Sequence, residues 1–225
     1  MAISAEQPLS HFPVLHTSSL DEACDVVTRF YLPHALTPVG STQLDASLNA
    51  YEGRSLTVGY LTYHADTKLT MPPAENTYHI NLTTVGTTYA SRQDGARAIT
   101  EAEVSGLVLL PNQRTTVTWA PDAEQFILKV PRARLESHLA DLIGRPVKDV
   151  INFDFSIDFT TPQGRSLLAS VQFLARELDR PGGIAEMPLA REELETFTLS
   201  QLLIAARNPY VDELTRPAEA CASAD

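Results

Sequence analysis

The sequence has too few basic residues for a protein that binds nucleic acid. Its 225 residues include 17 Lys and Arg against 28 Asp and Glu, which gives a formal net charge of -11. Nucleic-acid binding requires clustered Lys and Arg that replace phosphate counterions. The nearest approach to a cluster is the pair Arg132 and Arg134, and such a pair at a helix start is typical of a solvated surface. We therefore expect no direct contact with DNA from this chain.

The sequence also has little of what secreted and membrane proteins need. It has 2 cysteines, Cys24 and Cys221, without the spacing of a disulfide framework, which indicates free thiols in a reducing compartment. The start MAISAEQPLSHFP lacks the basic segment followed by an apolar one that marks a signal peptide. No apolar run approaches the roughly 18 residues of a membrane span. These absences predict a cytoplasmic protein without a membrane partner.

The common catalytic and metal-binding signatures are absent as well. There is no G-x-S-x-G elbow, P-loop, G-x-G-x-x-G or H-E-x-x-H pattern. Metal sites on β-strands often use two histidines one residue apart, whereas this chain has His79 followed by Asn81. The remaining histidines show no ligand spacing either. We therefore predict no metal, no cofactor and no chemistry that depends on one.

What the sequence does contain is a long series of strand-length segments between Leu44 and Val130. These segments are rich in Val, Thr, Leu and Tyr and are separated by Gly, Pro, Asn and Asp turns. We expect strands near residues 45–51, 55–63, 67–71, 77–84, 86–92, 96–101, 106–110, 114–119 and 124–130. So many short strands without intervening helices predict a barrel or jelly roll. A capped amphipathic helix beginning at Ser19 precedes them.

After Val130 the apolar period becomes helical. Helices are predicted over 131–144, 162–180 and 188–207, and the segment 152–159 between them alternates strictly between apolar and polar residues. The last helix is apolar on more than one side, so it must pack against two surfaces. One surface can be a second subunit, or the helix can be buried within its own domain. The residues predicted for a dimer interface are Leu194, Phe197, Leu199, Leu202 and Leu203.

Polar and aromatic side chains on the predicted strands fit a ligand cavity. A small barrel lined by apolar residues with a few polar groups is a common site for a small molecule. The candidates for ligand binding are Arg54, Tyr60, Tyr63, His64, Tyr78, His79 and Trp119, with Asn81 beside them. Structural roles are open alternatives: core packing for Trp119, a hydrogen-bonded strand histidine for His79 and a surface charge for Arg54. Alternation separates Tyr78 from His79 but does not say which of them faces inward.

The order of these elements resembles the N-terminal domain of AraC/XylS-type transcription regulators. The most specific stretch, Pro131 to Pro146, is similar to the family's I-P-R-x-x-L-E-x-x-L-x-x-L-x-G-x-P junction after the last barrel strand. Residues 77–95 match its barrel pattern of an aromatic strand, a Gly and a polar hairpin. The resemblance implies an α+β fold with a small cupin-like β-barrel (jelly roll) followed by a C-terminal helical subdomain. It further implies a small-molecule effector, a homodimer, and DNA binding only through a domain absent from this chain.

This resemblance predicts four parts. They are an N-terminal arm and helix (1–43), the barrel (44–130), a helical dimerisation subdomain (131–207) and a linker stump (208–225). We expect a ligand-sensing and dimerisation domain rather than an enzyme. One alternative is a metal-independent cupin-type enzyme, such as a small sugar isomerase or epimerase, with Tyr78 and His79 as an acid/base pair. Another is a dimerisation module whose barrel is filled.

Overall fold

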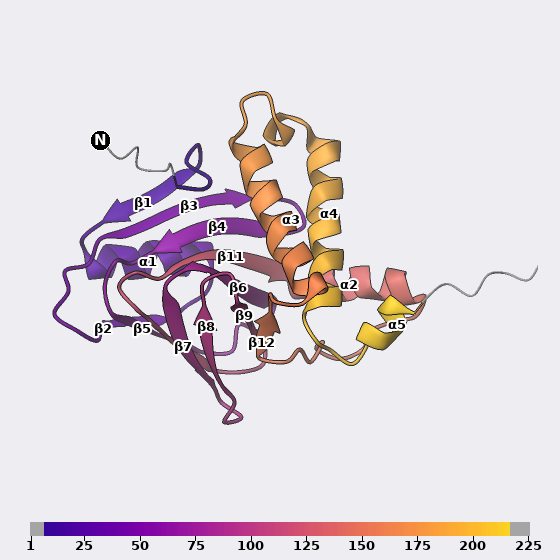
Figure 1. Cartoon of the computed structure of the whole chain (residues 1–225), viewed down its shortest axis with the longest axis horizontal. Helices are drawn as coiled ribbons and strands as arrows, with labels where there is room; N and C mark the ends of the chain where they lie inside the picture. Colours follow the sequence, from indigo (N-terminus) through magenta and orange to yellow (C-terminus); the bar gives the residue numbers. More distant parts are fainter. Residues whose placement is uncertain (1–6, 217–225) are drawn as a thin grey trace, which may run out of the picture.

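The computed structural model describes residues 7–216 and shows a β-barrel with helices against one outer face (Figure 1). Two antiparallel sheets enclose the barrel interior, and the C-terminal part of the chain is helical. This is the predicted α+β class, a cupin-like jelly roll followed by a C-terminal helical subdomain. Residues 217–225, which include Cys221 and half of the predicted linker stump, lie outside the described part.

The predicted strands and helices are present, with small shifts at their ends. The strands are β1 (Pro13–Thr17), β2 (Ala35–Pro38), β3 (Ala46–Glu52), β4 (Thr57–Thr62), β5 (Thr67–Met71), β6 (Thr77–Val85), β7 (Thr87–Arg92), β8 (Arg97–Glu101), β9 (Ser105–Leu109), β10 (Thr115–Trp119), β11 (Glu124–Pro131) and β12 (Ser156–Asp158). The helices are α1 (Leu20–Phe30), α2 (Arg132–Ile143), α3 (Pro162–Asp179), a short 3-10 helix (Ile184–Glu186), α4 (Pro188–Ala205) and α5 (Val211–Thr215).

Residues on both sides of the predicted barrel segment contribute strands to it. The larger sheet has the order β1-β3-β4-β11-β6-β9-β12 and the smaller one β2-β5-β10-β7-β8. Thus β1 and β2 extend opposite sheets, and β12 pairs with β9. The predicted boundaries at 43/44 and 130/131 therefore pass through the barrel. Because α1 connects the edge strands β1 and β2, it covers the gap between the two sheets at that side.

The ends of the helices follow local sequence signals. The amide of Glu22 donates to Ser19 Oγ at 3.3 Å, which caps the start of α1. Gly144 ends α2 with φ 69°, the left-handed conformation that glycine adopts without steric cost. In 151–160 the alternation is complete, with buried residues at every odd position to 159 and exposed ones at every even position. This segment lies along the core as predicted.

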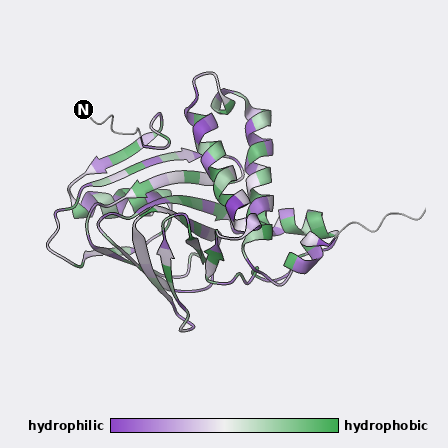
Figure 2. Ribbon diagram, viewed as in Figure 1, coloured by the Kyte–Doolittle hydropathy of each residue, from purple (hydrophilic) through white to green (hydrophobic). Residues whose placement is uncertain are grey.

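The helical hairpin α3–α4 packs on the outer face of the larger sheet (Figure 1). Figure 2 shows apolar residues in both helices of the hairpin as well as in the central strands. Leu199, Leu202 and Leu203 are fully buried inside the chain's own core. They therefore cannot contact a partner's surface, which corrects the expectation for these three residues. Leu194 is half-buried against the same core, while Phe197 is 50% exposed.

The segment after α4 belongs to the folded body rather than to a linker as far as the structure describes it. Asn208 is buried and its amide donates to the carbonyls of Leu203 and Ala206, both at 2.8 Å. Leu214 in α5 packs against the core, and Arg145 pairs with Glu213 at 2.9 Å. These contacts correct the predicted start of the stump at residue 208.

Candidate functional site in the barrel interior

A small cavity lies between the two sheets, beside the end of α1. About 30 Å³ of it is open to the centre of a water molecule, enough for roughly two waters. Its apolar wall comes from strands of both sheets and from α1, with Val27, Leu61, Leu69, Val117 and Ile127 among the lining residues. No charged side chain lines this cavity among the described residues. The wall of the cavity is therefore mostly apolar and carries no charge.

Several polar atoms at this cavity have no partner in the described part of the chain. They are Tyr31 Oη, His34 Nε2, His79 Nε2 and Trp119 Nε1, all from lining residues. Tyr63 Oη is also unpartnered, and its ring meets that of Trp119 edge-on with centroids 5.1 Å apart. A buried polar group left unpaired costs on the order of 1–3 kcal/mol, and native proteins contain few of them. Their concentration at one cavity marks a place where a bound molecule would gain hydrogen bonds.

Five other polar side chains in the barrel form a hydrogen-bonded network by contrast. Asn81 Nδ2 donates to Gln125 Oε1 at 2.9 Å, and Gln125 Nε2 donates to Thr83 Oγ1 at 2.9 Å. Thr100 bridges Thr83 and Thr88 at 2.7 and 2.6 Å. This network rigidifies its part of the interior without needing a ligand. Unpartnered polar atoms also occur elsewhere, at Thr67, Thr115, Arg191 and Glu195, but the cavity gathers the aromatic and imidazole ones.

The ionisable groups of the cavity are neutral at physiological pH. Burial lowers the pKa of His79 to about 3, and the nearby charge of Lys129 acts in the same direction. Burial also lowers the pKa of His34 and raises the pKa of both Tyr31 and Tyr63. The site thus offers hydroxyl and indole donors together with neutral imidazole nitrogens.

The buried His79 predicts a loss of stability in acid. Its ring is neutral when folded, but the unfolded chain binds a proton below the ordinary pKa of 6.5. The stabilisation is therefore complete above pH 6.5 and is lost as the pH falls toward 3, by about 2 kcal/mol at pH 5. Urea unfolding at pH 7 and 5 should show this loss reduced in His79→Gln and retained in His16→Gln, since His16 is exposed. Equal losses in wild type and His79→Gln would contradict it.

The structure brings three of the seven predicted ligand-binding residues to this part of the interior and separates the others. Tyr63, His79 and Trp119 are inside the barrel. Arg54 pairs with Glu192 at 2.9 Å on the surface, and His64 occupies the β4–β5 turn with φ 48°. Whether any of the seven binds a ligand stays a prediction.

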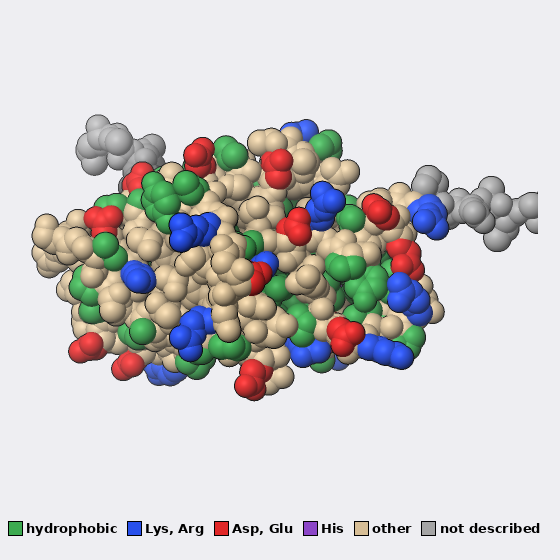
Figure 3. All heavy atoms as spheres, turned by 90° about the horizontal axis from the view of Figure 1, so that it is seen from below, with side chains coloured by type: hydrophobic (Ala, Val, Ile, Leu, Met, Phe, Trp, Pro, Cys, Tyr) green, Lys and Arg blue, Asp and Glu red, His purple; other side chains and the backbone are tan. Residues whose placement is uncertain are grey.

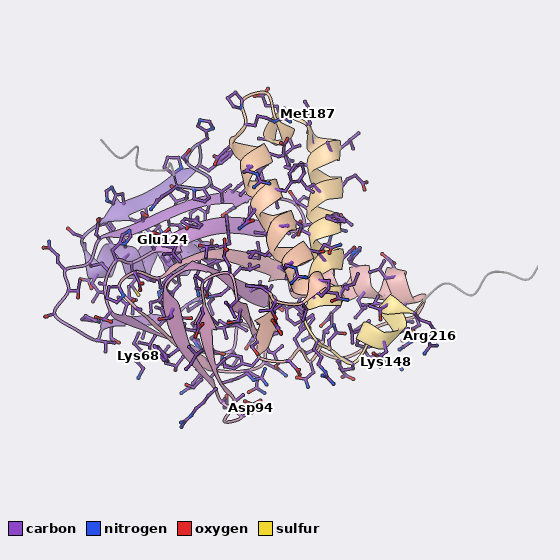
Figure 4. All side chains as sticks on the ribbon, in the orientation of Figure 1. Lys68, Asp94, Glu124, Lys148, Met187 and Arg216 are labelled. Carbon is purple, nitrogen blue, oxygen red and sulfur yellow. The ribbon has the colours of Figure 1, made fainter. Side chains whose placement is uncertain are left out.

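Tyr60 and Tyr78 point out of the barrel, toward the helices. The hydroxyl of Tyr60 donates to Glu124 at 2.5 Å (Glu124 is labelled in Figure 4), and that of Tyr78 donates to Glu136 at 3.0 Å. Tyr60 also lines an outer groove of about 440 Å³ between the larger sheet and α3. Because Tyr78 and His79 lie on opposite faces of β6, they cannot act together on one substrate as the enzyme alternative requires.

Tyr31 and His34 are the polar cavity residues that sequence reasoning missed. They lie between α1 and β2, outside the strands on which the candidates were sought. No local pattern distinguishes them, because only the closure of the barrel by α1 brings them to the interior. Their positions after a helix that joins two edge strands are the one signal available in retrospect.

The fold defines a cupin-like barrel protein with a helical subdomain packed on one sheet. More particularly, the chain belongs to the AraC-binding-like domain family, whose model matches residues 23–204. It is 27% identical over 205 residues to the probable thc operon regulatory protein of Rhodococcus erythropolis. That similarity covers 89% of this chain and 61% of the relative, so the chain spans less than two thirds of the relative's length.

One solved structure supports the fold, and a second is similar only in part. The AraC-like transcriptional activator CuxR aligns with a TM-score of 0.51 at 10% identity, over 78% of this chain and 63% of CuxR. The cupin 2 conserved barrel domain protein from Leptotrichia buccalis aligns with a TM-score of 0.35 at 6% identity, over 43% of this chain and 47% of that protein. At these identities the likeness concerns architecture alone.

Proposed function

We propose that this chain is the effector-sensing and dimerisation domain of an AraC-type transcription regulator. A small molecule binds in the barrel cavity and alters how a DNA-binding domain outside this chain is presented. The observation that carries the proposal is the set of buried, unpartnered polar atoms around the cavity. Such a domain works in the cytoplasm as a sensor rather than as an enzyme. On the face seen in Figure 3, acidic and basic side chains are interspersed, which suits a domain that does not itself hold DNA.

Strands β6 and β11 provide a physical connection between the cavity and the helices. Successive residues of β6 alternate, so that His79 lies at the cavity while Tyr78 contacts Glu136 of α2 and accepts from the amide of Ile151 at 2.7 Å. An effector shifts this arrangement only if it binds one conformation of barrel and helices better than another. The differential affinity is the signal that reaches the DNA-binding domain.

A second copy of the chain is the proposed partner of the exposed hairpin surface. Phe173 on α3, Met187 at the tip of the hairpin (Figure 4), and Leu189 and Phe197 on α4 are large apolar residues that stay exposed. Leu189 is 82% exposed. Exposed apolar groups gathered on adjacent helices favour an association surface. Dimerisation through these residues replaces the contact predicted for the buried leucines.

A ligand screen monitored by Trp119 tests the sensing function. Trp119 is the single tryptophan of the chain and lies at the cavity, so its emission reports directly on the site. An effector at 100 times its Kd should stabilise the domain by about 2.7 kcal/mol and change the Trp119 emission in a saturable way. Tyr89→Ala, on the exposed outer face of β7, should respond as wild type does. A broad screen without any saturable response would favour the filled dimerisation module.

A further inference from the structure

The interior of the barrel contains an aromatic ring from the chain's own N-terminal segment. Tyr31 follows the last residue of α1 and is 6% exposed. Its hydroxyl lies over Gly59 of β4, where a Cβ atom would collide with it. The ring meets His79 edge-on with centroids 6.2 Å apart. The absence of a side chain at Gly59 is therefore what gives the phenol its space.

Tyr31 fills this space without using its hydroxyl. Its Oη has no partner among the described residues. By contrast, Tyr60 and Tyr78, which lie in the larger sheet, both donate to carboxylates. His79 Nε2 and Trp119 Nε1 at the same cavity are unpartnered too. A tyrosine evolved only to pack would be expected to satisfy its hydroxyl, or to be replaced by phenylalanine. The phenol is thus a poorly matched occupant of a polar site.

The attachment of Tyr31 allows its side chain to leave without breaking either sheet. The residue lies outside regular structure, with φ -115° and ψ -80°, and its amide donates to Val27 of its own helix at 2.9 Å. The end of α1 is held to the barrel by Lys129 Nζ, which donates to the Phe30 carbonyl at 2.6 Å. Moving the segment between α1 and β2 costs side-chain packing, this contact and the hydrogen bond between His79 and the Tyr31 backbone. The contacts of Cys24 and Thr28 with His34 tie the segment to α1, but no ladder hydrogen bond is broken. Such elements are the ones that open at low cost.

We propose that the effector is an uncharged, ring-sized molecule with a hydrogen-bonding group, and that it binds by taking the place of the Tyr31 side chain. This inference rests on the proposed sensing function. The cavity of about 30 Å³ is too small for such a molecule unless the phenol leaves. The molecule is uncharged because no charged side chain lines the cavity among the described residues, and an unpaired buried ion is far more costly than a neutral polar group.

Displacement of Tyr31 would convert binding into a movement of α1. Since α1 bridges the edge strands β1 and β2, its shift changes how the N-terminal segment lies on the barrel. The occupied and empty states of the cavity then differ in the position of a whole helix. Competition with the internal phenol also weakens the apparent affinity by the fraction of open protein.

Calorimetric titration with p-cresol, the uncharged analogue of the tyrosine side chain, tests the proposal. Wild type should bind p-cresol weakly, Tyr31→Ala at least tenfold more tightly, and neither should bind 4-hydroxybenzoate, which is similar in size but anionic. Tyr31→Phe keeps the ring and should stay near wild type. In wild type, p-cresol should accelerate hydrogen exchange of the α1 amides while slowing exchange in β6, because the helix leaves as the ligand enters.

Each contrary result would overturn a different part of the proposal. Equal p-cresol affinity in wild type and Tyr31→Ala would exclude competition, and equal binding of 4-hydroxybenzoate would exclude the uncharged class. Failure of p-cresol to bind either protein also overturns the class. In these cases a saturable Trp119 response to another compound would still support the sensing function. If no compound in a broad screen gives such a response, the sensing function is contradicted as well. If Tyr31→Ala does not fold, slower or unchanged α1 exchange in wild type with p-cresol overturns displacement.

Discussion

Replacing Leu203 with Glu should unfold the domain, whereas replacing Phe197 with Glu should leave it folded and separate the proposed dimer. Leu203 is 0% exposed within one chain, and Phe197, on the same helix, is 50% exposed. Truncating a buried leucine to alanine costs about 2–5 kcal/mol, and burying a charge there costs more. Domain stabilities are themselves about 5–15 kcal/mol. Leu203→Glu should therefore unfold the domain, whereas Phe197→Glu should remove only a surface contact.

Urea unfolding followed by circular dichroism, together with sedimentation velocity, separates these outcomes. Leu203→Ala should stay folded and measurable, and its free energy of unfolding should fall by about 3 kcal/mol. Phe197→Glu and Leu189→Glu should unfold near the wild-type midpoint and sediment as monomers. A folded, monomeric Leu203→Glu would show that this leucine faces a partner after all. A dimer that survives Phe197→Glu combined with Leu189→Glu would move the interface off α4.

Replacing Glu195 with Ala should destabilise the domain by about 3 kcal/mol, because the β3–β4 turn loses the buried carboxylate that accepts its hydrogen bond. The side chain of Glu195 is 2% exposed, and its Oε2 accepts from the Ser55 amide at 2.7 Å. Arg191 Nε lies 3.6 Å from Oε1. Burial raises the pKa of Glu195, while the Ser55 amide and Arg191 act in the opposite direction. Without the carboxylate, the Ser55 amide is left buried and unpaired.

Glu192, one turn earlier on α4, supplies a matched control. Glu192 pairs with Arg54, which lies in the β3–β4 turn as Ser55 does, at 2.9 Å, but the Arg54 side chain is 77% exposed. Exposed ion pairs contribute about 0–1 kcal/mol, so Glu192→Ala should unfold almost at the wild-type midpoint in urea. Similar losses for the two variants would mean that the Glu195 contact does not anchor α4 to the barrel. An anchored α4 also ties the proposed dimer surface to the sheet that forms the cavity wall.

Local sequence patterns predicted most of the secondary structure because short-range physics determines it. Alternation identified the strands and the 152–159 segment, and capping residues such as Ser19 and Gly144 located helix ends. The apolar surface on several sides of α4 predicted two packing partners, of which the structure shows the one within the chain's own core. It could not assign Leu203 to the core and Phe197 to the surface, since both are simply apolar residues of one helix.

The ligand candidates show the same limit from the other direction. Trp119, Tyr63 and His79 could be proposed because aromatic and polar residues on barrel strands are typical of cavities. Tyr31 could not, because its place in the interior depends on how α1 closes the gap between two sheets. Arg54 was a reasonable candidate for a cavity mouth, yet Glu192, 138 positions away, holds it at the surface.

By itself, the sequence determined the class of fold, the order of its elements and the family resemblance, since these follow from periodicity, turn residues and motifs along the chain. Only the tertiary structure decided which face of β6 looks inward. Both faces of that strand are buried, one between the sheets and one under the helices. The apolar pattern of the sequence therefore does not indicate which face lies inside the barrel. The same closure of sheets and helices placed Tyr31 among unpartnered polar groups and hid three leucines of α4. Contacts between distant segments made those choices, and no local pattern records them.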